Sequence, residues 1–355
     1  MADVGTLKLN SMSLMVQTPQ QGGLLRLLPK LHSTVAFVLG TMTASGNGED
    51  CLKYDYYHET CPQAEVIIAE RMHAFIQKDI TVPSKLIRMH FHDCFVRGCD
   101  GSILINSTTD NQAEKDSPKN NPSLQGYEFI DQIKEALEYQ CPGVVSCADI
   151  LAYAARESVY ESGNFEHYPV RGGRRDGRIS RASDVLENIP PPTFEVDQLL
   201  LSFSRKGLSL EELVTLSGAH SIGVAHCSAV GGRQLNFNNT GHPDPTLDFI
   251  LAKALREECP VIPGGDDPIV FMDRFTPTIL DHRYYEFLLQ NKGLFTSDQT
   301  LLTNELTRRE VMADAVHPSS WEKKFVKAMI KMGEIKEFTD NKGEVRRHCA
   351  FVNLY

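Results

Sequence analysis

The 355-residue chain has little of several features that mark broad classes of protein. It carries 36 Lys and Arg against 46 Asp and Glu, a formal net charge of −10, and so lacks the basic excess of a nucleic-acid-binding protein. The apolar run at residues 35–40 is too short to span a bilayer. Strand-like alternation is scarce, and the sequence holds neither an internal repeat nor a low-complexity segment. With 41% hydrophobic and 23% charged residues, the composition indicates a folded globular protein.

The nine cysteines lack the spacing of a zinc site. No C-x2-C pair occurs, and the C-x4-C of Cys94 and Cys99 matches such a site poorly. Histidines in H-x-x-x-H spacing, which a zinc hydrolase would need, are absent as well. Eight cysteines lie between Cys61 and Cys349, an even number that favours four disulfides and an oxidising compartment. Sequence alone leaves the connectivity open, and Cys51 is left over.

Residues 1–46 have the features of a secretory leader rather than of a packed domain. Arg26 and Lys30 lie among leucines, the apolar run follows, and small residues extend to Gly46. The run is short and a long segment precedes it, so an N-terminal extension or an incorrectly assigned start stays open as the alternative. Residues 47–355 are predicted to form the folded domain.

Helical periodicity dominates this domain. One helix is predicted to open at Pro62 and a second to run from about Pro83 into His92. Further helices are predicted at about 126–139, 146–161, 195–206, 210–217, 226–235, 246–257, 282–291, 300–313 and 319–332. The polar stretch 106–125 is predicted to be a surface loop, and the Gly-rich segment 168–176 an extended connection. The fold class is therefore mostly α, one continuous fold whose two lobes meet near Pro190.

The densest group of reactive side chains runs from Arg88 to Ser102. Arg88 and His92 are four residues apart on a predicted helix and so share one face. An imidazole can accept a proton and pass it on, and a guanidinium can stabilise negative charge on a departing oxygen. Asp93, Asp100 and Ser102 supply hard oxygens at the short, irregular spacing of a calcium loop. Alone, each residue would be expected to be a solvated polar group at a helix end, but the cluster favours a site.

This stretch resembles the distal haem motif of the secretory plant (class III) haem peroxidases, the horseradish-peroxidase type. Residues 211–223, in which His220 lies between Ser217-Gly-Ala and Ser221-Ile-Gly, resemble their proximal haem motif. The match extends from about Cys61 to Asn353 and its motifs are highly specific.

The resemblance implies the two-lobed plant-type peroxidase fold, with haem b between a distal half, about 51–190, and a proximal half, about 191–355. It implies an enzyme that reduces hydrogen peroxide and oxidises small phenols in one-electron steps. Lignin precursors are the expected donors, and consumption of peroxide under oxidative stress is an expected role.

The resemblance also assigns roles to single residues. Arg88 and His92 would be catalytic, with Asn120 orienting His92. His220 would be the axial ligand of the haem iron. Asp298, in a matching segment at 293–299, would be its hydrogen-bond partner and would increase electron density on the ligand. A histidine that only packs, an aspartate that is only a surface charge and an asparagine that only forms a turn remain the alternatives.

Two calcium ions are implied as well. The first would be held by Asp93, Val96, Gly98, Asp100 and Ser102, with Glu114 linking this set to the distal haem side. The second would be held by Ser221, Asp273, Thr276, Ile279 and Asp281. Because Ser221 follows His220 directly, calcium there would hold the proximal ligand in place.

The implied disulfides are Cys61–Cys141, Cys94–Cys99, Cys147–Cys349 and Cys227–Cys259, and Cys51 has no counterpart in the family. Pro190 falls where the family has a proline whose carbonyl contacts reducing substrates, although a proline that only ends a loop is the alternative. The single tryptophan, Trp321, lies in a late helix, so no tryptophan radical is expected beside His220. Phe91, next to His92, fits the secretory branch.

Some positions depart from the family pattern. Gly172 stands where leucine is usual, and Ser228 and Ala229 stand where an Arg-Phe pair is familiar. Donor specificity is therefore not carried over from the family.

We expect a secreted monomer in the extracellular space or cell wall, without a nucleic-acid partner or stable membrane insertion. Glycans are expected at the sequons of Asn106 and Asn238. Two other classes remain as alternatives: a haem-free structural or calcium-binding protein on the same fold, and a zinc hydrolase.

Overall fold

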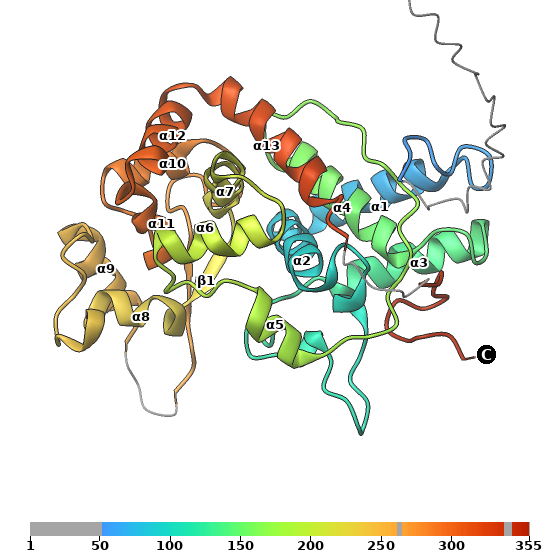
Figure 1. Cartoon of the computed structure of the whole chain (residues 1–355), viewed down its shortest axis with the longest axis horizontal. Coiled ribbons are helices and arrows are strands. Elements are labelled where there is room, and N and C mark those ends of the chain that lie inside the picture. Colours follow the sequence, from blue (N-terminus) through green and yellow to red (C-terminus); the bar gives the residue numbers. More distant parts are fainter. Residues whose placement is uncertain (1–51, 261–264, 337–342, 355) are drawn as a thin grey trace, which may run out of the picture. The chain divides into compact units, whose positions relative to one another are not determined.

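A computed structural model describes residues 52–260, 265–336 and 343–354, and every structural statement below concerns those residues (Figure 1). The predicted leader at 1–46 and Cys51 lie outside them. The described chain is mostly helical, as the sequence predicts, and it also has one two-stranded sheet that the sequence pattern does not predict. No described helix is both long enough and apolar enough to cross a membrane.

The helices fall in the following positions. They are α1 (Ala64–Lys78), α2 (Val82–Arg97), α3 (Tyr127–Gln140), α4 (Cys147–Ser162), α5 (Ala182–Asn188), α6 (Val196–Arg205), α7 (Leu210–Ser217), α8 (Cys227–Leu235), α9 (Phe249–Glu258), α10 (Arg283–Leu289), α11 (Thr296–Gln299), α12 (Glu305–Val316) and α13 (Pro318–Met332). The strands are β1 (Val224–His226) and β2 (Ile269–Phe271), paired antiparallel with Val224 opposite Phe271.

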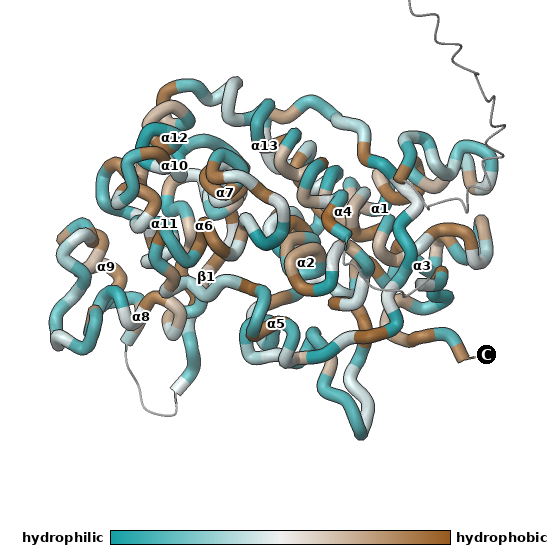
Figure 2. The backbone as a smooth tube through the Cα atoms, in the orientation of Figure 1, coloured by the Kyte–Doolittle hydropathy of each residue, from teal (hydrophilic) through white to brown (hydrophobic). Residues whose placement is uncertain are grey.

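Three hydrophobic cores hold these elements together. In the first, α1, α3 and α4 pack against one side of α2 through residues such as Ile68, Leu86 and Ile150. α4 is buried along nearly its whole length, and its apolar residues are visible in Figure 2. In the second, α6, α7, α10, α12 and α13 surround Trp321 and Phe325.

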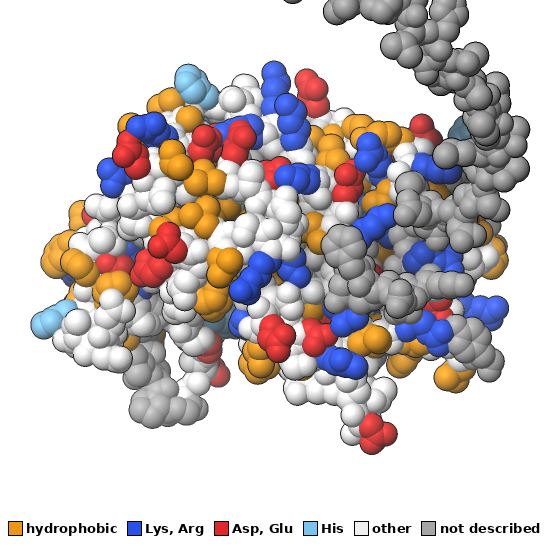
Figure 3. Space-filling view, viewed as in Figure 1, with side chains coloured by type: hydrophobic (Ala, Val, Ile, Leu, Met, Phe, Trp, Pro, Cys, Tyr) orange, Lys and Arg blue, Asp and Glu red, His pale blue; other side chains and the backbone are white. Residues whose placement is uncertain are grey.

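The third and smallest core lies under α8, α9 and the two strands. α2 contributes to both larger cores, with Leu86 in the first and Phe95 in the second. This double packing fixes the position of the helix that carries Arg88 and His92. On the face shown in Figure 3, acidic and basic side chains are interspersed.

Four disulfides are present, and their pairing is the one that the resemblance implied: Cys61–Cys141, Cys94–Cys99, Cys147–Cys349 and Cys227–Cys259. The third joins the first turn of α4 to the C-terminal segment, 202 residues away in sequence.

The end of α2 differs from the prediction. The helix does not stop at His92 but continues to Arg97, so Asp93 and Val96 lie on it rather than in a loop. No helix-breaking residue occurs before Gly98, whose φ of 80° is accessible to glycine and ends the helix there.

The stretch 106–125 is only partly the surface loop that its polar composition predicts. Glu114, Ser117 and Asn120 are fully buried. The amide of Asn120 bonds to His92 and to the backbone oxygen of Glu114 inside the protein. α5 was not predicted, and the helix predicted from about 300 begins at Glu305, where the Asn304 side chain accepts hydrogen bonds from two backbone N–H groups.

Candidate active site

The first half of the site is built on α2. Arg88 and His92 lie one turn apart, and the Nδ1 atom of His92 is 2.6 Å from Oδ1 of Asn120. An amide oxygen only accepts hydrogen bonds, so Nδ1 carries the proton and Nε2 keeps its lone pair. Burial, followed by the charge of Arg88, lowers the pKa of His92 well below its usual value. His92 is therefore a neutral base at Nε2.

Asn120 is fixed from its other end. Its Nδ2 atom donates to the backbone oxygen of Glu114 at 2.7 Å, and the side chain is fully buried. An amide bonded at both ends cannot rotate freely, so the orientation of His92 is fixed with it. This geometry is the one required of a residue that orients His92.

Arg88 is partly buried and keeps its positive charge. One terminal nitrogen donates to the backbone oxygen of Lys119 at 3.3 Å and to the hydroxyl of Ser123 at 3.0 Å. Both partners are neutral and do not cancel the charge. Burial lowers the pKa of Arg88 to about 10, so the guanidinium stays positive at neutral pH. A cation is thus held beside a neutral base.

The second half of the site surrounds His220, in a 3-10 turn (Gly218–Ser221) that follows α7. Its Nδ1 atom lies 2.7 Å from Oδ1 of Asp298, which is 1% exposed. The imidazole itself keeps 42% of its side-chain area accessible. When His220 is neutral and its Nδ1 donates to the carboxylate, the accessible Nε2 has the lone pair that a metal ligand needs.

Asp298 is held by two further donors. The hydroxyl of Tyr284 donates to the same oxygen, Oδ1, at 3.1 Å, and the backbone N–H of Phe295 donates to Oδ2 at 2.9 Å. Burial and the neighbouring carboxylate raise the pKa of Tyr284 well above its usual value, so its hydroxyl keeps its proton.

Gly218, two residues before His220, packs closely against the core behind the turn. A side chain at Gly218 would meet Tyr285 and Trp321 at 2.7–2.9 Å. The core behind the turn therefore leaves no room for a side chain at Gly218. The same core holds Trp321, which is buried and packs against Tyr285.

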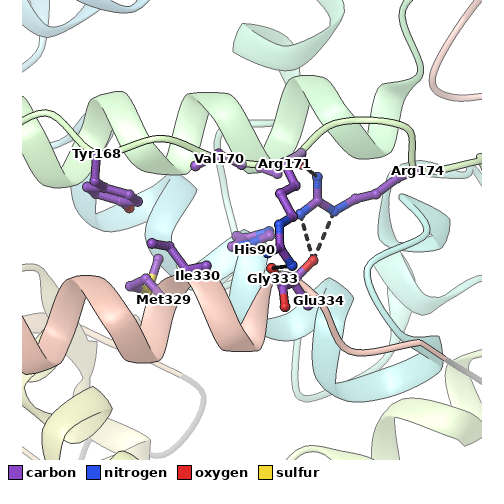
Figure 4. Close-up of a pocket in the computed structure, with 10 residues that line it drawn as sticks. His90, Tyr168, Val170, Arg171, Arg174, Met329, Ile330, Gly333 and Glu334 are labelled. Carbon is purple, nitrogen blue, oxygen red and sulfur yellow. Dashed lines mark hydrogen bonds and ion pairs between the residues drawn. The ribbon is translucent and has the colours of Figure 1, made fainter. Parts of the chain in front are cut away.

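His90 lies on the same helix as His92 but belongs to a different environment. It lines a small cavity with Arg174, Gly333 and Glu334, where Arg174 donates to the backbone oxygen of Gly333 (Figure 4). Burial, and secondarily Arg174, lowers the pKa of His90 to about 3. His90 is thus a neutral packing residue, as a lone histidine usually is.

The first predicted calcium set brings buried carboxyl groups together. Asp93 accepts from the backbone N–H groups of Gly101 and Ile103, and Asp100 from that of Ser102. Both oxygens of Glu114 and the hydroxyl of Ser102 are buried without a hydrogen-bond partner. Burial and neighbouring carboxylates raise the pKa of Asp93 and of Glu114 well above usual values.

Burial raises the pKa of Asp100 to about 6. The oxygens of the three carboxylates do not all lie within 4.8 Å of one another. A cation here would therefore also need backbone carbonyls, as expected of Val96 and Gly98, with Glu114 on the periphery.

The second predicted set lies beside His220. The hydroxyl of Ser221 accepts from the backbone N–H of Asp281, and Asp273 accepts from that of Phe275. The Thr276 hydroxyl oxygen is 3.0 Å from a carboxylate oxygen of both Asp273 and Asp281. A hydroxyl has one hydrogen, so only one of these contacts can be its donated bond. Ile279 lies in the same segment, and its side chain is exposed.

Lys119 connects the loop that carries Asn120 to the segment before Pro190. Its ammonium donates to the backbone oxygens of Leu186, at 2.9 Å, and of Ile189, which precedes Pro190. Neither Lys119 nor Tyr284 was singled out from the sequence. The two partners of Lys119 lie 67 and 70 residues away and that of Tyr284 lies 14 residues away, and no motif spacing marks these pairs.

One departure from the family pattern has a steric explanation. A side chain at Gly172 would meet the hydroxyl of Tyr153 at 2.6 Å and Tyr56 at 3.0 Å. The space that a leucine would occupy is thus filled by tyrosines.

Comparison with known proteins finds similar sequences over most of the chain. The sequence profile of the family described as Peroxidase matches residues 68–316. Peroxidase 5 of Vitis vinifera is 49% identical over 320 residues, which cover 90% of this chain and 97% of that protein. Peroxidase 3 of Arabidopsis thaliana is 45% identical over 306 residues, 85% and 92% of the two chains. Peroxidase 64 of the same plant is 46% identical over 297 residues, 84% and 92%.

Proposed function

The chain belongs to the plant class III haem peroxidases, and on that basis we propose that His92 and His220 act on opposite faces of one haem group. The family fixes the activity as that of a peroxidase acting on hydrogen peroxide, and it implies haem as the cofactor. The roles of single residues, the calcium ions and the donor substrates are our proposals.

The donor chemistry around His220 supports its role as axial ligand. A neutral imidazole whose Nδ1 donates to a buried carboxylate has an electron-rich Nε2, the ligand atom that haem iron takes from histidine. Haem, when bound, supplies iron redox chemistry, through which peroxide is cleaved and phenols are oxidised.

On the other face, His92 and Arg88 handle the peroxide. His92 accepts the proton from one peroxide oxygen at Nε2 and delivers it to the other, which leaves as water. Arg88 stabilises the negative charge that develops on the departing oxygen. Asn120 keeps Nε2 unprotonated and directed toward the reacting atoms. The observation that carries the proposal is this buried, neutral histidine with a fixed tautomer beside an uncancelled cation.

Two calcium ions complete the proposed site. The support for the first is the set of buried oxygens of Glu114 and Ser102 that lack any partner, since such groups are costly unless a cation or water satisfies them. The support for the second is the Thr276 hydroxyl placed between two carboxylates. Calcium prefers carboxylate, hydroxyl and carbonyl oxygens such as these.

Small phenols, among them lignin precursors, are the proposed donors, with the carbonyl of Pro190 as a contact. The hydrogen bond from the Lys119 ammonium to the backbone oxygen of Ile189 supports this contact, because it fixes Pro190 relative to the loop that carries Asn120. We further propose a secreted, glycosylated monomer. All three residues of the Asn238 sequon are exposed, and in the Asn106 sequon Ser107 and Thr108 are exposed while Asn106 is half-buried.

The absorption spectrum of the purified protein tests the haem assignment. We expect a Soret band in wild type, and a weakened or shifted band in His220→Ala because the axial ligand is lost. A haem-free protein on the same fold would show no Soret band at all. His90→Gln is the matched control, since His90 is equally a histidine but lies outside the site, and its spectrum should match wild type.

The zinc hydrolase has no support. Among the described residues, the one cluster of three His, Cys, Asp or Glu side chains within metal-binding reach is His90, Cys94 and Cys99. Two of its members are joined in a disulfide and so cannot serve as thiolate ligands.

A further inference from the structure

Oδ1 of Asp298 accepts two hydrogen bonds in a site where one would be enough to hold His220. The first comes from Nδ1 of His220 at 2.7 Å and the second from the hydroxyl of Tyr284 at 3.1 Å. The other carboxylate oxygen has its own donor, the backbone N–H of Phe295. Tyr284 therefore competes directly with His220 for one oxygen atom.

We propose that Tyr284 is a positioning residue that weakens the His220–Asp298 hydrogen bond and thereby raises the reduction potential of the haem iron. This inference rests on the proposed function, in which His220 is the axial ligand.

The physical reason is the sharing of charge. A carboxylate that accepts from His220 alone draws the Nδ1 proton strongly and gives the ring partial imidazolate character, which stabilises ferric iron. A second donor on the same oxygen takes part of that negative charge. The Nδ1 proton then stays closer to the ring, and the ring donates less electron density through Nε2.

Burial makes this competition effective. Asp298 is 1% exposed and Tyr284 5%, so water does not take the place of either donor, and hydrogen bonds to a charged group in such a site are strong. Tyr284 is also held in place, because its ring packs edge-on against His220 at 6.2 Å and against Tyr285 at 5.1 Å.

Tyr285 offers a matched control. It is adjacent in sequence and fully buried, but its hydroxyl donates to the backbone oxygens of Val214 and Thr215 instead of Asp298. Tyr284→Phe and Tyr285→Phe therefore remove the same atom from neighbouring buried sites, and only the first removes a bond to Asp298.

The experiment measures the Fe(III)/Fe(II) potential by spectroelectrochemistry and the iron–histidine stretching frequency of the ferrous protein by resonance Raman. In Tyr284→Phe we expect a lower potential and a higher frequency, because the His220–Asp298 bond strengthens. In Asp298→Asn we expect shifts of the opposite sign. Tyr285→Phe should match wild type in both. A 3-fluorotyrosine at position 284, a stronger donor that preserves packing, should raise the potential.

The outcomes separate the inference from its premise. If Asp298→Asn shifts both quantities while Tyr284→Phe behaves as Tyr285→Phe does, the role of Tyr284 is wrong and the axial site stands. If none of the three variants changes the iron–histidine signal, the assignment of His220 and Asp298 is itself wrong. If Tyr284→Phe binds haem poorly, the protein with 3-fluorotyrosine at position 284 provides the test. A reduction potential equal to that of wild type in this protein would also overturn the inference.

Discussion

Three histidines illustrate how neighbouring groups decide what an imidazole does. Nδ1 of His92 donates to the neutral amide of Asn120, and His92 is the proposed base, whereas Nδ1 of His220 faces the carboxylate of Asp298, and His220 is the proposed haem ligand. His90 lies against the sulfur of Cys94 at 3.7 Å, and burial keeps its ring neutral. The residue type is the same, and the partner on Nδ1 separates base, ligand and packing group.

The pH dependence of the peroxide reaction should reveal the influence of Arg88 on His92. A base works only when unprotonated, so the rate falls as pH drops through its pKa. Burial and the Arg88 charge lower that pKa well below the usual value, so wild type should keep its rate from neutral pH well into the acid range. In Arg88→Leu one cause is removed, and the acid limb should move to higher pH.

Stopped-flow rates of the peroxide reaction, measured across pH for wild type and Arg88→Leu, test this shift of the acid limb. Loss of the guanidinium should also slow the reaction of the variant at every pH. Arg181→Leu, a change of the same chemistry at an exposed arginine, is the control. An acid limb at the same pH in Arg88→Leu and wild type would contradict the electrostatic role.

Among the elements, α2 shows where sequence reasoning succeeds and where it stops. Arg88 and His92 are one turn apart, so helical spacing alone places them on a common face, and the structure has them there. The sequence predicts an end near His92, because the polar residues after it are typical of a loop unless they are buried, but the helix continues to Arg97. Asn120 lies 28 residues from His92, and only the family resemblance connected the two.

The stretch from 106 to 125 shows where a prediction from composition fails. Its polar composition predicts exposure, yet Glu114 and Asn120 are buried, and Asn120 bonds to His92 and to the backbone of Glu114. Composition indicates how polar residues behave on average, and it does not identify the individual polar residues that are buried. Lys119 and Tyr284 went unnoticed for a related reason, since their partners are defined by tertiary contacts with carbonyl or carboxylate oxygens.

The tie between this loop and the C-terminal end of α5 leads to a prediction for donor binding. Lys119→Met removes the hydrogen bonds to the oxygens of Leu186 and Ile189, at a cost on the order of 1 kcal/mol for each bond. The segment of Pro190 should loosen, so KM for a phenolic donor should rise severalfold. At neutral pH the rate constant for peroxide should stay within about twofold. The backbone oxygen that accepts from Arg88 remains in the variant, and loss of the Lys119 charge removes only the smallest cause of the low pKa of His92.

Steady-state kinetics with guaiacol and transient kinetics with peroxide separate the two effects. Lys115→Met is the control, because Lys115 is in the same loop but bonds to Asn106. A donor KM equal to that of the control would remove Lys119 from any role in positioning Pro190.

For the whole described chain, a long-range disulfide stabilises the fold, and the proposed calcium ions would act beside the two site histidines. The disulfide Cys147–Cys349 closes the longest loop, which in the chain-entropy model contributes roughly 5 kcal/mol. The first calcium set includes Asp93, directly after His92, and the second includes Ser221, directly after His220. Calcium is thus expected to hold both faces of the haem, in addition to stabilising the fold.

Removal of calcium should therefore change the site as well as the stability. A cation that binds only the native state stabilises it by about 2.7 kcal/mol at a concentration one hundred times its Kd. Chelation should lower Tm, alter the spin state of the iron and reduce turnover, and added calcium should reverse all three. Asp273→Asn should reproduce part of the loss by weakening the second set.

Asp267→Asn is the matched control, since Asp267 bonds to Ser228 at an exposed position outside both sets. Metal analysis that finds no tightly held calcium, together with a spectrum insensitive to chelator, would show that these oxygens hold no ion.

The central claim is that His92 is the base that cleaves peroxide on a haem held by His220. Stopped-flow mixing of hydrogen peroxide with His92→Ala, followed at the Soret band, tests it most directly, because the resting spectrum reports at once whether haem is still bound. We predict a resting spectrum close to wild type and a rate constant at least about 10²-fold lower, the contribution typical of a positioned general base. A rate constant within a factor of two of wild type would contradict the account.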